Sequence, residues 1–133
     1  MKSELKRLFS RAAMLLLIML LTTTTAWAED AITGLTYNTT GGYYEIPDAD
    51  ALNALRTYVN QGNDCSSKTF KQTADITLTS AFSPIGNSSS NIFQGTYNGN
   101  GKTISGLTIE GGNTIYQALF GNVQNATIPY PGA

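Results

Sequence analysis

The sequence contains no histidine and a single cysteine among its 133 residues. Without histidine the chain has no imidazole for a nucleophile pair such as Ser-His-Asp, for a general base at neutral pH, or for a metal site. The single cysteine, Cys65, forms neither a disulfide within the chain nor a cysteine-rich zinc site. These absences exclude imidazole-based catalysis and histidine- or cysteine-rich metal sites within this chain, and we assign no catalytic, cofactor-binding or metal-binding residue and no cofactor.

The first 28 residues have the pattern of a secretory signal peptide. A basic start (Lys2, Lys6, Arg7 and Arg11) is followed by an apolar run over residues 12–21. The small residues Ala26 and Ala28 then form a signal-peptidase site on either side of Trp27. The apolar run is shorter than the ~20 residues that cross a bilayer. We expect cleavage after Ala28, a secreted or cell-surface location, and no membrane span after signal removal.

Charged residues are also scarce, at 13% of the chain against an average of ~25%. The whole sequence has 8 basic and 9 acidic residues, of which four basic residues and Glu4 lie in the signal, so the mature chain has a net charge of −4. Nucleic acid carries a dense negative charge and binds proteins through basic patches. The composition therefore excludes nucleic acid as an expected partner.

The next part, residues 29–67, begins with a predicted β-hairpin. Short alternating or aromatic runs at residues 34–37 and 43–46 flank the turn-rich residues 38–42. Tyr43 and Tyr44 are expected to pack on a sheet face. Paired tyrosines can alternatively form a platform on which sugar rings stack.

A helix is predicted over residues 48–60. Asp48 can serve as the N-cap, and Leu52, Leu55 and Val59 recur at helical spacing to form one apolar face. Gly62 provides a stop after the helix. We interpret Asp48 and Asp50 as helix-capping residues rather than as an acid–base pair.

From Thr69 onward, short apolar strands are separated by glycine and asparagine. The apolar positions recur at intervals near or above ~20 residues, and such a repeat is typical of a solenoid. Residues 95–103 end like a phosphate-binding loop, but Thr96 stands where the first glycine is needed and a strand follows. Two turns, at Asn98-Gly99 and Asn100-Gly101, are the better interpretation. Asp64, Asp75 and Glu110 are scattered carboxylates.

The order of several segments resembles exported bacterial surface proteins with the GLUG motif. The segments that carry the resemblance are residues 48–62, 70–78, Pro84-Ile85-Gly86, 93–109 and Ala118-Leu119-Phe120-Gly121. The resemblance covers about residues 45–128 and implies a mainly β fold, the start of a right-handed parallel β-helix with an N-terminal hairpin and one capping α-helix. The face formed by Leu52, Leu55 and Val59 would then seal the end of the solenoid.

The same resemblance predicts the interior and the end of the solenoid. The expected interior residues are Phe93, Ile104, Leu107, Ile109, Phe120 and Ile128. The family continues beyond this point, whereas Pro129 and Pro131 cannot donate to a β-ladder. We therefore expect residues 68–133 to hold the first rungs of a β-helix that is truncated.

The resemblance implies a non-enzymatic exported or cell-surface β-helix segment with a role in adhesion or surface display. Host or bacterial glycans or surface proteins are the implied partners. One alternative is the N-terminal part of a secreted polysaccharide-degrading enzyme or peptidase whose catalytic region is absent from this chain. Another is a small secreted module that binds glycans through its tyrosines.

Overall fold

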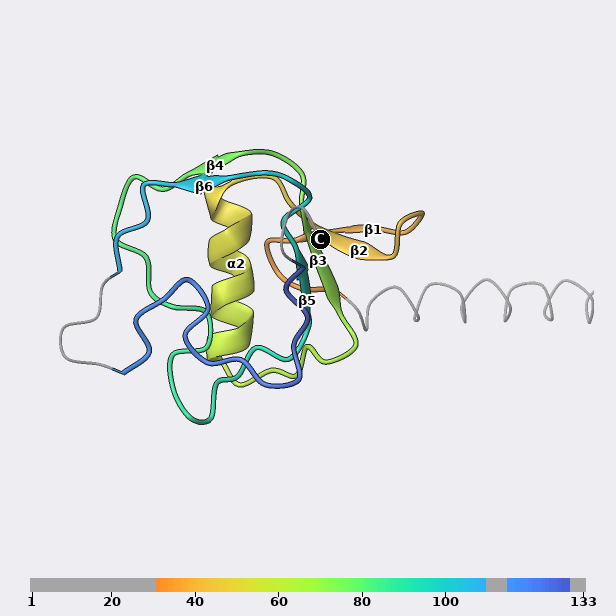
Figure 1. Ribbon diagram of the computed structural model, residues 1–133. Coiled ribbons are helices and arrows are strands. Elements are labelled where there is room, and N and C mark those ends of the chain that lie inside the picture. The colour runs from red at the N-terminus through yellow and green to blue at the C-terminus, as the bar shows by residue number, and fades with distance from the viewer. Residues whose placement is uncertain (1–30, 110–114, 130–133) are drawn as a thin grey trace, which may run out of the picture. The chain divides into compact units, whose positions relative to one another are not determined.

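The computed structural model describes residues 31–109 and 115–129, and the described residues from Ile32 onward belong to one compact unit (Figure 1). The predicted signal peptide, residues 1–28, lies outside the described residues. In the described part the chain is mainly β with one helix. Its elements are β1 (Thr36–Asn38), β2 (Tyr43–Ile46), α2 (Ala49–Asn60), β3 (Thr69–Gln72), β4 (Ile76–Thr77), β5 (Thr96–Asn98) and β6 (Ile104–Ser105).

The predicted hairpin is confirmed, because β1 and β2 pair antiparallel with Tyr37 opposite Tyr44. Gly42, at a φ of 71°, closes the turn, and its N–H donates to the carbonyl of Asn38 at 2.8 Å. The first strand begins at Thr36, later than expected. Gly34 has a φ of 84° and belongs to a turn before the strand, which a glycine permits without steric cost.

The helix prediction is also confirmed, together with both of its ends. Oδ1 of Asp48 accepts a hydrogen bond from the N–H of Ala51 at 2.9 Å, which satisfies one of the free donors of the first turn. At the other end the N–H of Gly62 donates to the carbonyl of Val59 at 2.9 Å, and Gly62 has a φ of 82°. Leu52, Leu55 and Val59 are fully buried.

The strands after the hairpin pair in parallel. β2, β3 and β5 lie side by side, with Tyr44 opposite Phe70 and Phe70 opposite Tyr97. β4 pairs in parallel with β6, and the hydroxyls of Thr77 and Ser105, which are 28 positions apart in the sequence, lie 3.3 Å from each other. Four isolated parallel bridges continue the pattern: Phe82 to Ile109, Ile85 to Phe120, Phe93 to Val123 and Thr96 to Thr127.

These pairings divide the chain into successive passes, which we name by their residues. The first pass is residues 69–95, and the second pass is residues 96–109 and 115–124. Residues 126–128 begin a third, since Thr127 lies beside Thr96 as Thr96 lies beside Thr69. Each pass runs alongside the preceding one in the same direction.

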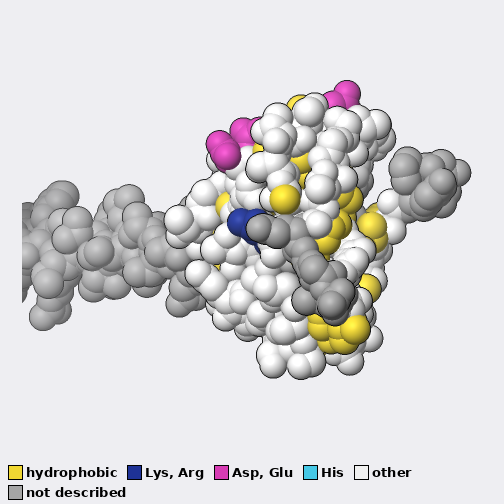
Figure 2. Space-filling model, turned by 90° about the vertical axis from the view of Figure 1, so that its left-hand side faces the viewer, with side chains coloured by type: hydrophobic (Ala, Val, Ile, Leu, Met, Phe, Trp, Pro, Cys, Tyr) yellow, Lys and Arg dark blue, Asp and Glu magenta, His cyan; other side chains and the backbone are white. Residues whose placement is uncertain are grey.

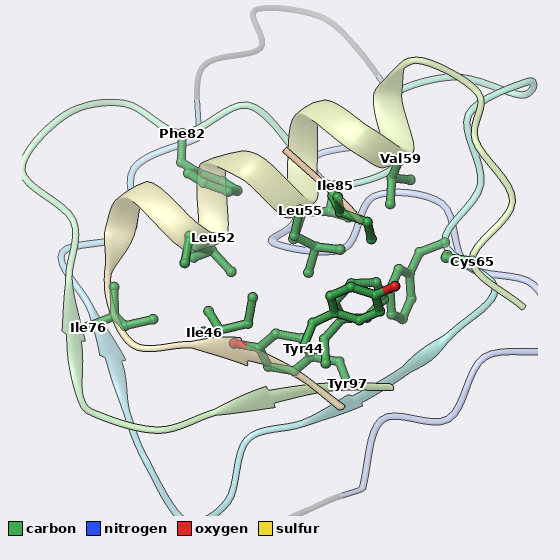
Figure 3. Packing of buried hydrophobic residues seen from close by; sticks show 14 of the residues in the cluster. Tyr44, Ile46, Leu52, Leu55, Val59, Cys65, Ile76, Phe82, Ile85 and Tyr97 are labelled. Atoms are coloured by element: carbon green, nitrogen blue, oxygen red, sulfur yellow. The ribbon is translucent and has the colours of Figure 1, made fainter. Parts of the chain in front are cut away.

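The core lies between helix α2 and the first pass (Figure 3). Leu52 and Leu55 point from the helix toward Ile46 and Tyr44 of β2. A row of aromatic rings crosses the passes, with centroid separations of 5.3 Å for Tyr44 and Phe70, 6.1 Å for Phe70 and Phe93, and 4.9 Å for Phe93 and Phe120. Apolar burial and these ring contacts hold the passes together.

The predicted interior is correct for the first pass and partly wrong for the rest. Phe93 is fully buried, and Ile104, Ile109 and Phe120 are half-buried. Leu107 and Ile128 were expected inside but are 42% and 46% exposed. The physical reason is that helix α2 and the second pass cover the first pass from two sides, whereas among the described residues only 126–128 pair with the far side of the second pass.

One glycine shows how closely the passes approach. Gly86 has a φ of 77°, and a Cβ at this position would lie 2.5 Å from the carbonyl oxygen of Asn122 in the second pass. Asn60 at the end of α2 fixes the same corner, since its Nδ2 donates to the carbonyl of Pro84 at 2.9 Å and its Oδ1 accepts from the N–H of Gly86 at 2.8 Å.

Candidate functional site

The outward side of the four-stranded sheet carries mainly polar side chains. Side chains alternate between the two sides of a strand, so the row of Tyr44, Phe70 and Tyr97 turns inward and its neighbours turn outward. We call this side the outer sheet face, formed by Tyr43, Glu45, Thr69, Lys71, Thr96 and Asn98. All six side chains are half-buried.

Polar and cationic groups surround one aromatic ring on this face. Nζ of Lys71 lies 4.9 Å from the ring centroid of Tyr43. Nδ2 of Asn38 donates to the hydroxyl of Tyr43 at 3.3 Å and to Oε1 of Glu45 at 3.0 Å. The face therefore combines hydrogen-bond donors, acceptors and one aromatic ring, which are the groups that bind polar ligands such as sugars.

The predicted sugar-stacking pair does not form as a joint platform. Tyr44 is 2% exposed, and its ring packs between Tyr37 at 4.9 Å and Phe70 at 5.3 Å. Tyr43 lies on the opposite side of the same strand. A ligand at the outer sheet face would reach Tyr43 and not Tyr44.

The carboxylates that the sequence analysis singled out each bind nearby backbone. Asp48 caps helix α2 as described above. Oδ1 of Asp64 accepts from the N–H of Ser66 at 2.8 Å, and Oδ1 of Asp75 accepts from the N–H of Thr103 at 2.8 Å. These hydrogen bonds stabilise the charged form and hold the pKa of Asp64 and of Asp75 below the ordinary value. Glu110 lies outside the described residues.

Within residues 31–109 and 115–129, no three histidine, cysteine or acidic side chains gather where they could hold a metal ion. Every buried side-chain nitrogen or oxygen in these ranges has a hydrogen-bond partner.

Cys65 lies in the loop between α2 and β3 and is fully buried. Its Sγ lies 3.4 Å from the N–H of Gln94, which donates to it. Burial raises the pKa of the Cys65 thiol, which lowers its thiolate fraction and its reactivity. Cys65 thus lies in the core, where the loop between α2 and β3 packs against Gln94 of the first pass.

Residues 95–103 contain strand β5 and a turn. Asn98 is the last residue of β5, so a single turn follows instead of the two expected ones. In this turn the N–H of Lys102 donates to the carbonyl of Gly99 at 2.9 Å, and Asn100 takes a φ of 53°. The strand β6 comes next along the chain.

A buried polar pair, Gln72 and Tyr97, escaped the sequence analysis. The hydroxyl of Tyr97 donates to Oε1 of Gln72 at 3.1 Å. Nε2 of Gln72 donates to the carbonyls of Ala74 and Thr103 at 3.0 and 2.9 Å. Burial raises the pKa of the Tyr97 phenol. The alternation of Phe70 and Gln72 along β3 was the available signal, since it places Gln72 on the inward side.

Comparison with protein-family models, with curated proteins and with solved structures finds no match for this chain. Among the described residues, no helix has the length and apolar character needed to cross a membrane.

Proposed function

We propose that this chain is a non-enzymatic, exported or cell-surface protein segment built as the start of a right-handed parallel β-helix, with a role in adhesion or surface display. The observation that carries the proposal is the parallel register between successive passes on several sides of the core: Phe70 with Tyr97, Ile76 with Ile104 and Phe82 with Ile109. A chain that repeats such a register buries its apolar side chains between neighbouring passes.

Helix α2 supports the proposed role of the N-terminal part as a cap. A solenoid needs a terminal unit that covers its apolar interior and presents polar groups to water. Leu52, Leu55 and Val59 are buried on one side of α2. Asp50 and Thr57, at other positions of the helix, are exposed. A sealed end is what a surface protein needs at the boundary between its repeats and solvent.

The outer sheet face is the proposed contact surface, and its partners would be glycans or surface proteins. Parallel strands repeat the outward side chains at a fixed strand spacing of ~4.8 Å, so a regular polar array forms along the passes. Glu45, Lys71 and Asn98 occupy one row of this array. Asp48, Asp64, Asp75 and Cys65 make their hydrogen bonds away from this face.

Export is tested by the N-terminus of the chain recovered outside the cell. Mass spectrometry of the secreted protein is expected to show Glu29 as the first residue. The variant Ala28→Leu should retain the signal, because a bulky residue replaces the small one at the cleavage site, whereas the matched control Trp27→Leu should be processed normally. A cytoplasmic chain that still begins at Met1 in all three would contradict the proposal.

Adhesion is tested by binding of the full processed chain to an array of host and bacterial glycans and to immobilised extracellular proteins. We expect specific signals that Tyr43→Ala and Lys71→Ala reduce at least about tenfold, which corresponds to about 1.4 kcal/mol. Thr79→Ala, an exposed residue of the first pass outside the outer sheet face, is the matched control and should bind like the wild type. Absence of any signal, or equal loss in the control, would contradict the proposed contact surface.

A further inference from the structure

The end of β5 and the turn after it carry two consecutive Asn-Gly steps, Asn98-Gly99 and Asn100-Gly101. At such a step the peptide nitrogen of the glycine can attack the side-chain carbonyl carbon, Cγ, of the asparagine. Glycine favours this attack because it has no side chain in the way and permits wide backbone rotation. The two steps are alike in sequence, so any difference between them comes from their surroundings.

The side chain of Asn98 is folded toward the nitrogen that would attack it. Its Oδ1 accepts a hydrogen bond from the N–H of Asn100 at 2.8 Å. This contact is an Asx turn, in which the side chain closes over the intervening peptide group, so Cγ of Asn98 is directed toward the peptide nitrogen of Gly99. Holding two reacting groups together in this way removes much of the entropic cost of the step.

The same hydrogen bond activates the carbonyl of Asn98. As a nitrogen adds to Cγ, negative charge develops on Oδ1, and a backbone N–H already aimed at this oxygen stabilises that charge. Across the described residues the N–H of Gly99 has no hydrogen-bond acceptor, so the attacking nitrogen is not engaged elsewhere. A Cβ built on Gly99 would meet nothing within 4 Å, which leaves room for the peptide group to rotate.

The side chain of Asn100 is held differently. Its Nδ2 donates to the backbone carbonyl of Gln72 at 3.2 Å, which anchors the side chain to β3. Nδ2 is the group that would have to leave, and here it is engaged in a contact that the reaction must break. Asn100 therefore serves as a natural comparison for Asn98 within the same chain.

We propose that Asn98 is a site of spontaneous deamidation. The nitrogen of Gly99 gives its proton to water and forms a bond to Cγ, and Nδ2 takes up a proton and leaves as ammonia. Water then opens the resulting cyclic imide at either of its two carbonyls, which yields aspartate or isoaspartate at position 98. Water is the only other reactant.

The product adds a carboxylate to the outer sheet face. Asn98 is paired with Lys71 of β3, and Lys71 is paired with Glu45 of β2. Charge is scarce in this protein, and Figure 2 shows only a few acidic and basic side chains on one face of the molecule. One new carboxylate in the row of Lys71 thus changes the local charge pattern as the protein ages. The effect on partners rests on the proposed function, whereas the modification itself does not.

Peptide mapping by mass spectrometry, during incubation of the full exported chain at neutral pH, tests the proposal. Deamidation replaces an amino group with a hydroxyl and so raises the mass of the peptide, and electron-transfer fragmentation distinguishes aspartate from isoaspartate. We expect Asn98 to react at least about tenfold faster than Asn100 in the folded chain, which is the effect of one hydrogen bond to a developing charge. In urea the two should react at nearly equal rates, because the contacts that distinguish them are lost.

Two variants separate the chemistry from the fold. Gly99→Ala should slow the reaction of Asn98 at least about tenfold, because a methyl group hinders the attacking nitrogen, and the open space at this position lets the variant fold. The matched control Asn100→Gly keeps the backbone N–H that activates Asn98 and should leave its rate unchanged. Equal rates at Asn98 and Asn100 in the folded chain, the same difference in urea, no slowing by Gly99→Ala, or no mass gain at Asn98 would each overturn the proposal.

Discussion

Truncation of an isoleucine to alanine should lower the free energy of unfolding much more at Ile85, in the first pass, than at Ile128 near the end of the described residues. Ile85 is fully buried, its bridge partner is Phe120, and its N–H donates to the carbonyl of Leu119 at 2.9 Å. Ile128 is 46% exposed. The substitutions Ile85→Ala and Ile128→Ala remove the same atoms, so any difference between them measures the environment of the side chain.

The expected magnitudes follow from burial. Truncation of a buried isoleucine to alanine costs about 2–5 kcal/mol, since the lost transfer free energy adds to the cost of a cavity. Complete burial of isoleucine contributes about 1.5–3 kcal/mol, and a side chain that is about half exposed retains roughly half of this. Water fills the space that Ile128 leaves, so no cavity term is added. We expect about 2–5 kcal/mol for Ile85→Ala and about 1 kcal/mol for Ile128→Ala.

Urea unfolding followed by far-UV circular dichroism measures both values. Equal losses in the free energy of unfolding for the two variants would refute the reasoning, because Ile85 and Ile128 would then be equally buried.

Three further predictions follow from individual contacts. Gly86→Ala should lower the free energy of unfolding by more than about 1 kcal/mol, because the left-handed backbone and the carbonyl of Asn122 both oppose a Cβ. The control is Gly99→Ala, where a Cβ meets nothing within 4 Å. Equal melting temperatures of the two variants in thermal denaturation would contradict the prediction. The carboxyl of Asp75 should titrate below its ordinary pKa of 3.8 in NMR, because the charged form accepts a hydrogen bond from the N–H of Thr103. The contribution of this hydrogen bond to stability is therefore present above the unfolded pKa and disappears as pH falls through the folded pKa. A measured pKa at or above 3.8 would be the contrary result. Cys65 should react with a thiol reagent only on unfolding, because it is fully buried, and fast labelling of the native chain would show that its loop opens.

Local features of the sequence predicted the hairpin and the helix well. Asp48, the apolar spacing of Leu52, Leu55 and Val59, and Gly62 act within a few residues of each other, so their consequences could be worked out without knowledge of the fold. The prediction after β5 was correct only in part, because one turn forms at Asn100-Gly101 and Asn98 belongs to the strand.

The burial of the later apolar residues could not be predicted in the same way. Phe93 and Val123 are both apolar and occupy bridged positions, yet one is fully buried and the other is 47% exposed. The difference depends on which segments lie on either side, and those segments are distant in the sequence. The buried hydrogen bond between Gln72 and Tyr97, 25 residues apart, is a long-range contact of the same kind.

The sequence by itself determined the scarcity of charge, the absence of imidazole chemistry, the signal-like N-terminus, and the positions of the hairpin and helix, because composition and local backbone preference are properties of neighbouring residues. Only the tertiary structure decided that Tyr43 and Tyr44 lie on different sides of the sheet, that Gln72 and Tyr97 form a buried hydrogen bond, and that Leu107 and Ile128 stay exposed. These outcomes depend on which hydrogen-bonding edges meet across long stretches of chain.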